Sequence, residues 1–208
     1  MLRYLTWDAL NHYPKLRDSM FLDRATQFRA RLKWEVTVDQ NGFERDQYDG
    51  LPGVIYTIWE RPDGTHGGSM RFLPTTGRTM LAEHFSSLTQ GVEIASPHIW
   101  ECTRFCLAPG AGNRTAPALM LAGLDLGLGH GLSHSVGVFD APMVRIYARL
   151  GWPPAVLGTQ GSGRTAISAG LWAFEPALRP VLLRRARVSA KDADRWYAQA
   201  FEGGVRAA

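Results

Sequence analysis

The chain has 208 residues, of which 45% are hydrophobic and 20% charged, and its net charge is +4. This composition is typical of a globular protein and excludes disorder as the main state, and the length predicts a single domain over residues 1–208. No apolar run approaches the roughly 20 residues of a membrane span. The first residues lack the pattern of a secretory signal, and two cysteines do not make a disulfide framework. We therefore expect a cytoplasmic protein.

The excess of positive charge lies near the C-terminus. Residues 176–208 contain seven basic and three acidic side chains, whereas the preceding residues are balanced. A local basic patch is typical of a surface that binds an acidic partner or phosphates, although a solvated protein face has the same composition. Nucleic acid is disfavoured as a partner because there is no extended basic stripe and no nucleic-acid-binding motif.

Apolar spacing predicts the elements of the first half of the chain. Apolar residues at helical intervals predict a helix over residues 20–33, with Arg24 on a neighbouring stripe. Residues 36–50 are polar and contain glycine, which indicates a loop. Residues 53–60 and 67–73 have strand-like compositions, and a Pro-Asp-Gly turn signal separates them. We expect these two strands to form a β-hairpin.

The second half of the chain alternates strands with helices. Expected strands are residues 98–107, 133–139, 152–157 and 168–174; expected helices are residues 117–128, residues 142–150 and a C-terminal helix that begins after Ser189. Thr115 and Asp140 are the expected N-caps of the first two helices. This order predicts an α/β or α+β sandwich, in which helices flank a mixed central sheet.

The two cysteines do not indicate a metal site. Cys102 and Cys106 lie four residues apart, and His98 precedes them at the same interval. On a regular strand the three side chains share a face, but a rise of ~3.3 Å per residue spreads them over about 26 Å. One metal ion cannot bridge that distance, so we expect buried thiols and no bound metal.

A set of charged and aromatic residues at characteristic intervals is the strongest functional signal. The set consists of Arg24, Phe28, Trp34, Asp46, Asp49, Arg71, Glu101 and Arg104. Arg71 and Glu101 lie within predicted strands, where a charge is costly unless it is paired or functional. Taken singly, each residue has a structural explanation: a helix surface, the apolar core or an ion-pair network. The joint pattern points to a site.

In this order and at this spacing, the eight residues resemble the acyl-homoserine-lactone synthase (autoinducer synthase) family. The family pattern begins with Arg, Phe and Trp separated by three and five residues. It continues with Asp-x-x-Asp in a Tyr-Asp context, an arginine on a strand, and Glu-x-x-Arg. All eight positions match, and the resemblance covers roughly residues 1–155.

The resemblance implies both a reaction and a fold. Family members acylate the amine of S-adenosylmethionine from an acyl thioester, which is carried on acyl carrier protein or coenzyme A. The carboxylate then closes a lactone and expels methylthioadenosine, giving a quorum-sensing signal. The implied fold is N-acetyltransferase-like with an acyl tunnel, and no tightly bound cofactor is implied. The alternatives are another coenzyme A-dependent N-acyltransferase of similar fold and a sensor that binds a small molecule without turnover.

The resemblance also implies roles for the matched residues. Catalytic candidates are Glu101, Arg104 and Asp46; candidates for binding S-adenosylmethionine are Arg24, Phe28, Trp34, Asp46, Asp49, Arg71 and Arg104. The attacking amine needs a proton acceptor, and burial would raise the pKa of Glu101 toward a useful value. Alternatively, Glu101 anchors the substrate or pairs with an arginine. The arginines would clamp the carboxylate, the aspartates would pair with the amine or hold the arginines, and the rings would stack on adenine or face the sulfonium.

The strand that carries Glu101 and Arg104 presents a geometric conflict. On a regular strand, residues three apart point to opposite faces of the sheet. The two side chains can share a site only if the strand is bulged, or if one of them supports the site from behind.

The acyl pocket and the carrier follow from the resemblance only by region. The candidates for lining the pocket are Ile99, Phe105, Val138, Phe139, Met143 and Trp152, and ordinary core packing explains them equally well. Residues 133–139 lack the threonine that many members preferring 3-oxo chains have, so Phe139 favours an unsubstituted acyl group that is short, branched or aromatic. The basic C-terminal region would suit acyl carrier protein. Residues 108–112 resemble a loop that holds coenzyme A pyrophosphate through backbone N–H groups. The sequence does not predict an oligomeric state.

Overall fold

The computed structural model describes residues 1–201, and its centre is a seven-stranded sheet in the order β1-β2-β3-β4-β5-β7-β6. The strands are β1 (Leu2–Thr6), β2 (Ile55–Glu60), β3 (His66–Pro74), β4 (Ile99–Leu107), β5 (His134–Asp140), β6 (Ala155–Gln160) and β7 (Ile167–Ala173). Neighbouring strands are antiparallel except β4 and β5, which are parallel and are connected by a helical crossover. The sheet is therefore mixed, as predicted.

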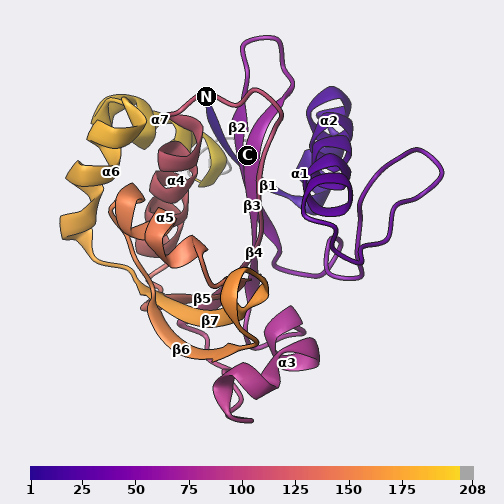
Figure 1. Ribbon diagram of the computed structural model, residues 1–208. Coiled ribbons are helices and arrows are strands. Elements are labelled where there is room, and N and C mark those ends of the chain that lie inside the picture. Colours follow the sequence, from indigo (N-terminus) through magenta and orange to yellow (C-terminus); the bar gives the residue numbers. More distant parts are fainter. Residues whose placement is uncertain (202–208) are drawn as a thin grey trace.

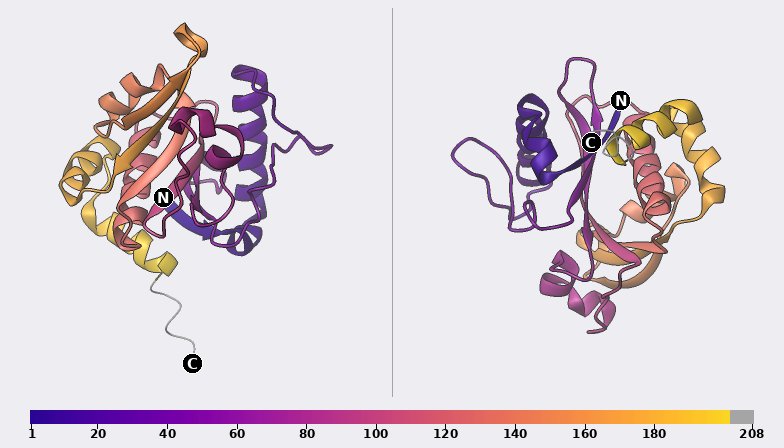
Figure 2. Two further views of the ribbon diagram at one scale, coloured as in Figure 1. Left: turned by 90° about the horizontal axis from the view of Figure 1, so that it is seen from below. Right: turned by 180° about the vertical axis from the view of Figure 1, so that it is seen from behind.

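Helices cover both faces of this sheet (Figure 1). They are α1 (Trp7–Asn11), α2 (Pro14–Arg24), α3 (Met80–His84), α4 (Thr115–Gly129), α5 (Met143–Leu150), α6 (Arg179–Ala186) and α7 (Ala190–Phe201). A π-helical turn, Ala25–Arg31, extends α2, and a 3-10 turn, Ser86–Thr89, follows α3. Helices α1 and α2 lie on one face, and α4, α6 and α7 lie on the other, as the two further views also show (Figure 2).

Helix α4 has almost no polar face because it is enclosed on two sides. It packs on β2 and β3 and is covered by α6 and α7. Leu119, Leu121 and Leu124 are fully buried, which is the pattern of a helix inside a core rather than on a surface. Its one acidic residue, Asp125, accepts a hydrogen bond at 2.7 Å from Arg179 of α6. This ion pair fixes α6 against α4.

Strands β4 and β5 pair over only three residues each and then separate. The pairing joins Ile99–Glu101 to residues 134–136. Just beyond it, a Cβ on Gly137 would lie 2.8 Å from the backbone oxygen of Cys102, so only glycine allows this close approach. The separation leaves a gap in the middle of the sheet, and the candidate site occupies it.

The structure confirms the local predictions and corrects several element ends. The hairpin of β2 and β3 and the strands β4, β5 and β7 lie where they were expected. The helix predicted over residues 20–33 begins earlier, at Pro14, and becomes π-helical from Ala25. Ser189 accepts the backbone N–H of Asp192 at 3.0 Å, as expected of an N-cap of α7.

Two predicted N-caps are wrong. Thr115 is the first residue of α4 and not its cap, and the capping position is occupied by Arg114 without a side-chain hydrogen bond. Asp140 ends β5, and the residue before α5 is Pro142, whose fixed φ starts the helix without a capping side chain. Asp140 is therefore available for another role.

Two further expectations concern what is absent. Within residues 1–201 no helix is long and apolar enough to cross a membrane, and no cluster of three or more metal-ligating side chains occurs. Both cysteines are free thiols. Glu202 and Arg206, which contribute to the basic C-terminal count, lie outside the described residues.

Candidate active site

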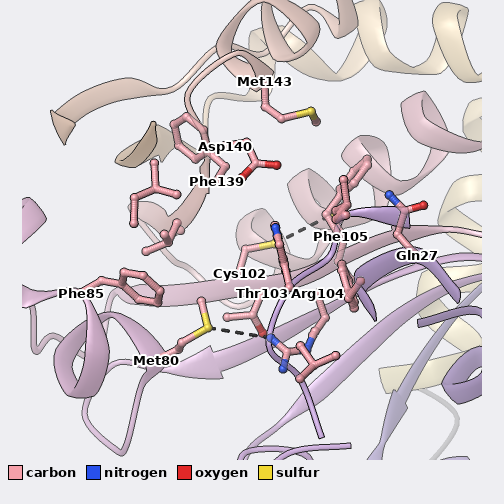
Figure 3. A pocket seen from close by; sticks show the side chains of 18 of the residues that line it. Gln27, Met80, Phe85, Cys102, Thr103, Arg104, Phe105, Phe139, Asp140 and Met143 are labelled. Atoms are coloured by element: carbon pink, nitrogen blue, oxygen red, sulfur yellow. Dashed lines mark hydrogen bonds between the residues drawn. The ribbon is translucent and has the colours of Figure 1, made fainter. Parts of the chain in front are cut away.

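A cavity of about 880 Å³ opens where β4 and β5 separate. The π-helical turn and the following loop border it on one side, and α3, α4 and α5 border the remaining sides. Figure 3 shows Arg104 at one part of this cavity, and Phe139, Asp140 and Met143 at another, with Cys102 between them in that view. The cavity therefore joins a charged region to a mainly apolar one.

A β-bulge at Arg104 shapes the charged region. Arg71 pairs with Thr103 and Ser69 with Cys106, so Met70 alone faces two residues of β4. Arg104 has the left-handed φ of +55°, which strains a non-glycine residue but is common in bulges at functional sites. On a regular strand, Glu101 and Arg104 would point to opposite faces of the sheet. The bulge removes this conflict, because it turns the Arg104 side chain to the sheet face that also carries Thr103.

The same bulge overturns one expectation for the cysteines. Cys102 lines the cavity and donates to the Met70 sulfur at 3.7 Å, whereas Cys106 is buried on the other face. The extra residue in β4 reverses the alternation of side chains between them. Cys102 and Cys106 therefore do not share a face, and burial raises the pKa of both thiols to about 12.

Three arginines and three carboxylates form one buried ion-pair network around the bulge. Arg24 donates through Nε to Glu44 at 2.6 Å and grips Asp49 with both terminal nitrogens, at 2.9 and 3.1 Å. Such bidentate pairs are the strongest and most directional ion pairs in proteins. Since α2 carries Arg24, this grip attaches the helix to the loop over residues 44–49.

Arg71 and Arg104 complete the network. Arg71 binds Asp46 through both terminal nitrogens, binds Asp49 at 2.8 Å and donates through Nε to the Thr103 hydroxyl at 3.0 Å. Arg104 reaches Glu44 at 2.8 Å and Asp46 at 2.7 Å. The six formal charges cancel, which is the condition for keeping them away from water.

The network shifts the ionisation of its carboxylates. Burial alone would raise the pKa of Asp49, but the guanidiniums of Arg24 and Arg71 hold it well below its usual range. Burial also opposes the charge on Asp46, and the hydrogen bond and charge of Arg71 lower its pKa. Both carboxylates are therefore ionised at neutral pH.

The network divides into an enclosed part and a part that faces the cavity. Arg24 and Arg71 are 1% and 0% exposed, and neither they nor Asp49 line the cavity. Arg104 and Asp46 do line it. The structure thus brings all the predicted charged residues near one another but leaves only these two of the network within reach of a ligand.

The two predicted aromatic residues lie beside this charged region. The rings of Phe28 and Trp34 stack with centroids 5.2 Å apart and planes only 6° from parallel. The backbone N–H of Trp34 donates to the Phe28 carbonyl at 2.9 Å, and Lys33 takes the left-handed φ of +60° that turns the chain back. Phe28 is buried, and Trp34 is 38% exposed at the rim.

Glu101 does not lie at the surface of the cavity. It is fully buried, does not line the cavity, and accepts the first backbone N–H groups of α3, from Met80 at 2.9 Å and Leu81 at 2.6 Å. Burial raises its pKa to about 7, because it outweighs the lowering effect of these two N–H groups and of Arg71. Glu101 therefore anchors α3 and also titrates near neutrality.

Five of the six residues expected in the acyl pocket line the cavity: Phe105, Val138, Phe139, Met143 and Trp152. The sixth, Ile99, does not. It lies in the paired part of β4, before the strands separate, and packs against a cluster that contains Leu81, Val136 and Ala169. The expectation for Ile99 is therefore corrected.

Sequence reasoning missed two residues that hold the network together. Glu44 is fully buried and bridges Arg24 and Arg104, although it stands in the same acidic stretch as Asp46. Tyr56 of β2 donates its hydroxyl to Asp49 at 2.7 Å. The sequence does contain a signal for Glu44, because it is acidic and stands two positions before Asp46. The role of Tyr56 depends on strand register, so the sequence contains no comparable signal for it.

Solved structures with similar folds include N-acyltransferases. A coenzyme A-dependent acyl-homoserine lactone synthase, MesI, superposes with a TM-score of 0.80 over 91% of this chain and 97% of that chain, at 23% identity. A second, BjaI with S-adenosylmethionine and isopentyl-CoA, has a TM-score of 0.80 over 95% and 98%, at 20% identity. An acyl-CoA N-acyltransferase from Pseudomonas aeruginosa has a TM-score of 0.57 over 83% of this chain and 99% of that chain, at 14% identity. The fold is thus acetyltransferase-like.

Sequence relatives identify the family within this class. The autoinducer synthase model matches residues 9–173. The acyl-homoserine-lactone synthase of Rhizobium etli is 43% identical over 83% of this chain and 84% of the relative, and that of Agrobacterium fabrum is 35% identical over 78% and 81%. The chain belongs to the autoinducer synthase family. It is an acyltransferase that makes acyl-homoserine lactones, as the eight-residue pattern predicted.

Replacing Asp49 tests the energetic role of the network. Asp49→Asn leaves the network of Arg24, Arg71 and Arg104 with only Glu44 and Asp46 as counter-charges, so one buried positive charge is unbalanced. We therefore expect a loss of ~3–5 kcal/mol in the free energy of unfolding by denaturant titration at pH 7. The surface substitution Asp18→Asn is the control, because its pair with Arg17 is exposed and should be worth less than ~1 kcal/mol. Equal losses in the two variants would contradict this role.

The pH dependence of the same variant gives a second measurement. The pKa of Asp49 is lower in the folded than in the unfolded protein, so its stabilisation is complete above an unfolded pKa of about 3.9 and is lost as the pH falls below it. The wild type should therefore lose stability in this acidic range more steeply than Asp49→Asn.

Proposed function

We propose that acylation and lactone closure both take place in the cavity between β4 and β5. The observation that carries this proposal is the continuity of the cavity: it joins Arg104 and Asp46, which suit a charged substrate, to an apolar chamber lined by Phe139, Met143 and Trp172. A charged amino acid derivative and an apolar acyl group can thus meet at the bulge. Residues 1–208 act as one synthase domain in this proposal, in the cytoplasm.

Arg104 is the residue that we assign to the carboxylate of S-adenosylmethionine. Its Nη1 makes no hydrogen bond to an oxygen within residues 1–201 and lies 3.9 Å from the Met80 sulfur, whereas its other nitrogens bind Glu44 and Asp46. Arg24 and Arg71 have no such free edge. They act as positioning residues that hold the loop and the bulge, together with Asp49.

The remaining polar and aromatic groups near Arg104 suit the other parts of the substrate. Asp46 is ionised and faces the cavity, so it can accept hydrogen bonds from the substrate amine. The exposed face of Trp34, stacked on Phe28, offers a flat surface for adenine or a π-face for the sulfonium cation. These contacts would hold the amine close to the acyl carbonyl.

Glu101 is the proton acceptor in this proposal, acting through water because it does not line the cavity. A pKa of about 7 is well matched to removing a proton from an amine at neutral pH. The amine then attacks the thioester carbonyl, forming the C–N bond and releasing the thiol of the carrier. Lactone closure forms a C–O bond from the carboxylate to the γ-carbon and breaks the C–S bond, which releases methylthioadenosine.

The acyl donor reaches the cavity on a pantetheine arm, which coenzyme A and acyl carrier protein share. The loop over residues 108–112 follows β4 directly and leads into α4. Arg61 donates to the Pro109 carbonyl at 2.8 Å and holds this loop. The two solved relatives MesI and BjaI are described as coenzyme A-dependent, which supports acyl-coenzyme A as a donor, and the basic C-terminal helices suit acyl carrier protein.

The first test is a mass-spectrometric assay of the purified protein with S-adenosylmethionine and matched coenzyme A and acyl-carrier-protein thioesters. We expect lactone and methylthioadenosine to appear together in equal amounts. An acylated product without methylthioadenosine would instead indicate a plain N-acyltransferase. The donor that is turned over faster identifies the carrier.

The role of Arg104 predicts a binding defect. Arg104→Lys keeps the charge beside Glu44 but loses the forked guanidinium, so the Kd for S-adenosylmethionine should rise about tenfold in calorimetry. The matched control is Arg78→Lys, because Arg78 is an exposed arginine that pairs with Glu83 and does not line the cavity. An unchanged Kd in Arg104→Lys would place the carboxylate elsewhere.

The role of Glu101 predicts a change in the pH profile. Wild-type kcat/KM should rise with pH through an apparent pKa of about 7 as Glu101 loses its proton. Glu101→Gln should lower kcat by ~10²–10⁴ and lose this rise, with the Kd for S-adenosylmethionine nearly unchanged. A variant that is slower but keeps the rise with pH would show that Glu101 only anchors α3.

A further inference from the structure

The apolar chamber contains a tyrosine hydroxyl that the proposed reaction does not use. Tyr147 of α5 is 6% exposed, and its ring packs edge-on against Phe105, Phe139 and Trp172 with centroids 6.2, 5.5 and 5.1 Å away. Its hydroxyl makes no hydrogen bond in residues 1–201. The hydroxyl is not sealed in the core, and Tyr147 lines the cavity.

An unpaired carboxyl group lines the same cavity as this hydroxyl. Asp140, at the end of β5, lines this cavity, and its carboxyl group makes no hydrogen bond or ion pair with the described residues. In Figure 3 its carboxyl lies beside Phe139 and Met143. Burial raises the pKa of Tyr147, and the charges of Cys102 and Asp140 raise it further. Asp140 and Tyr147 thus face one cavity from the end of β5 and from α5.

An acyl group that fills the chamber must displace water from both polar groups. An alkyl chain would leave both without a partner, which is unfavourable for desolvated polar groups. A ketone could accept from Tyr147 but would offer nothing to a carboxylate. A hydroxyl group can donate to Asp140 and accept from Tyr147 at the same time, so it satisfies both.

We propose that Tyr147 and Asp140 select an acyl donor whose acyl group carries a hydroxyl. This inference rests on the proposed function and names its substrate class. It differs from the expectation of an unsubstituted acyl group, which considered the missing threonine in residues 133–139 and the bulk of Phe139. The hydroxyl can stand on an aliphatic chain or on an aromatic ring, and the chemistry of recognition is the same for both.

The test compares kcat/KM for matched thioesters on one carrier. The aliphatic arm uses unsubstituted, 3-oxo and 3-hydroxy acyl groups of equal length, and the aromatic arm uses phenyl and 4-hydroxyphenyl acyl groups. In at least one arm we expect the hydroxylated donor to be preferred about tenfold or more, since a site that hydrogen-bonds a hydroxyl discriminates against analogues that lack it. The arm that shows the preference identifies the source of the hydroxyl.

Two variants assign the preference to these side chains. Tyr147→Phe keeps the ring contacts and removes only the hydroxyl, and Asp140→Ala removes the carboxyl. Each should lower the ratio of kcat/KM for the hydroxylated to the unsubstituted donor by about fivefold or more. Tyr4→Phe is the matched control, because the Tyr4 hydroxyl is enclosed in the core and Tyr4 does not line the cavity.

Equal kcat/KM values within both arms, or a preference for the 3-oxo donor, would overturn the inference. So would a uniform loss with all donors in Tyr147→Phe, because that is the signature of a structural role. These results all require methylthioadenosine release. If no donor releases methylthioadenosine, the proposed function itself fails and this inference fails with it.

Discussion

The interaction on which the site depends is the neutral, buried network of three arginines and three carboxylates. It draws its members from α2, the loop over residues 44–49, β3 and β4, and it fixes these segments relative to one another. A network of this kind is costly to build and very costly to break, because each charge left alone would be desolvated without a partner. Its residues therefore act as a unit, and the free edge of Arg104 is its only guanidinium surface that faces the cavity.

The bulge at Arg104 and the separation of β4 from β5 are two parts of one arrangement. Pairing ends after Glu101, and the left-handed residue follows three positions later. The bulge turns one charged side chain toward the substrate, and the separation provides the space in which the acyl group can lie. Neither feature alone would join a polar binding region to an apolar one.

Local patterns predicted most of the strands and the hairpin, because each depends on nearby sequence, whereas the eight matched residues came from their joint resemblance to the family pattern. Sequence alone did not reveal which of those residues face a ligand. Arg24 and Arg104 have the same chemistry, yet only the tertiary structure shows that Arg24 is saturated by Glu44 and Asp49. The five-residue helix α3 is too short to give a periodic signal, so the partner of Glu101 was also out of reach.

The single parallel strand pair has a consequence for how the chain acquires its shape. Antiparallel hairpins such as β2 and β3 are local in sequence and can form early, whereas β4 and β5 are separated in sequence by the α4 crossover and their pairing is non-local. The cavity lies at this non-local contact. We expect the substrate chamber to be among the last parts to form during folding and among the first to open in native-state hydrogen exchange.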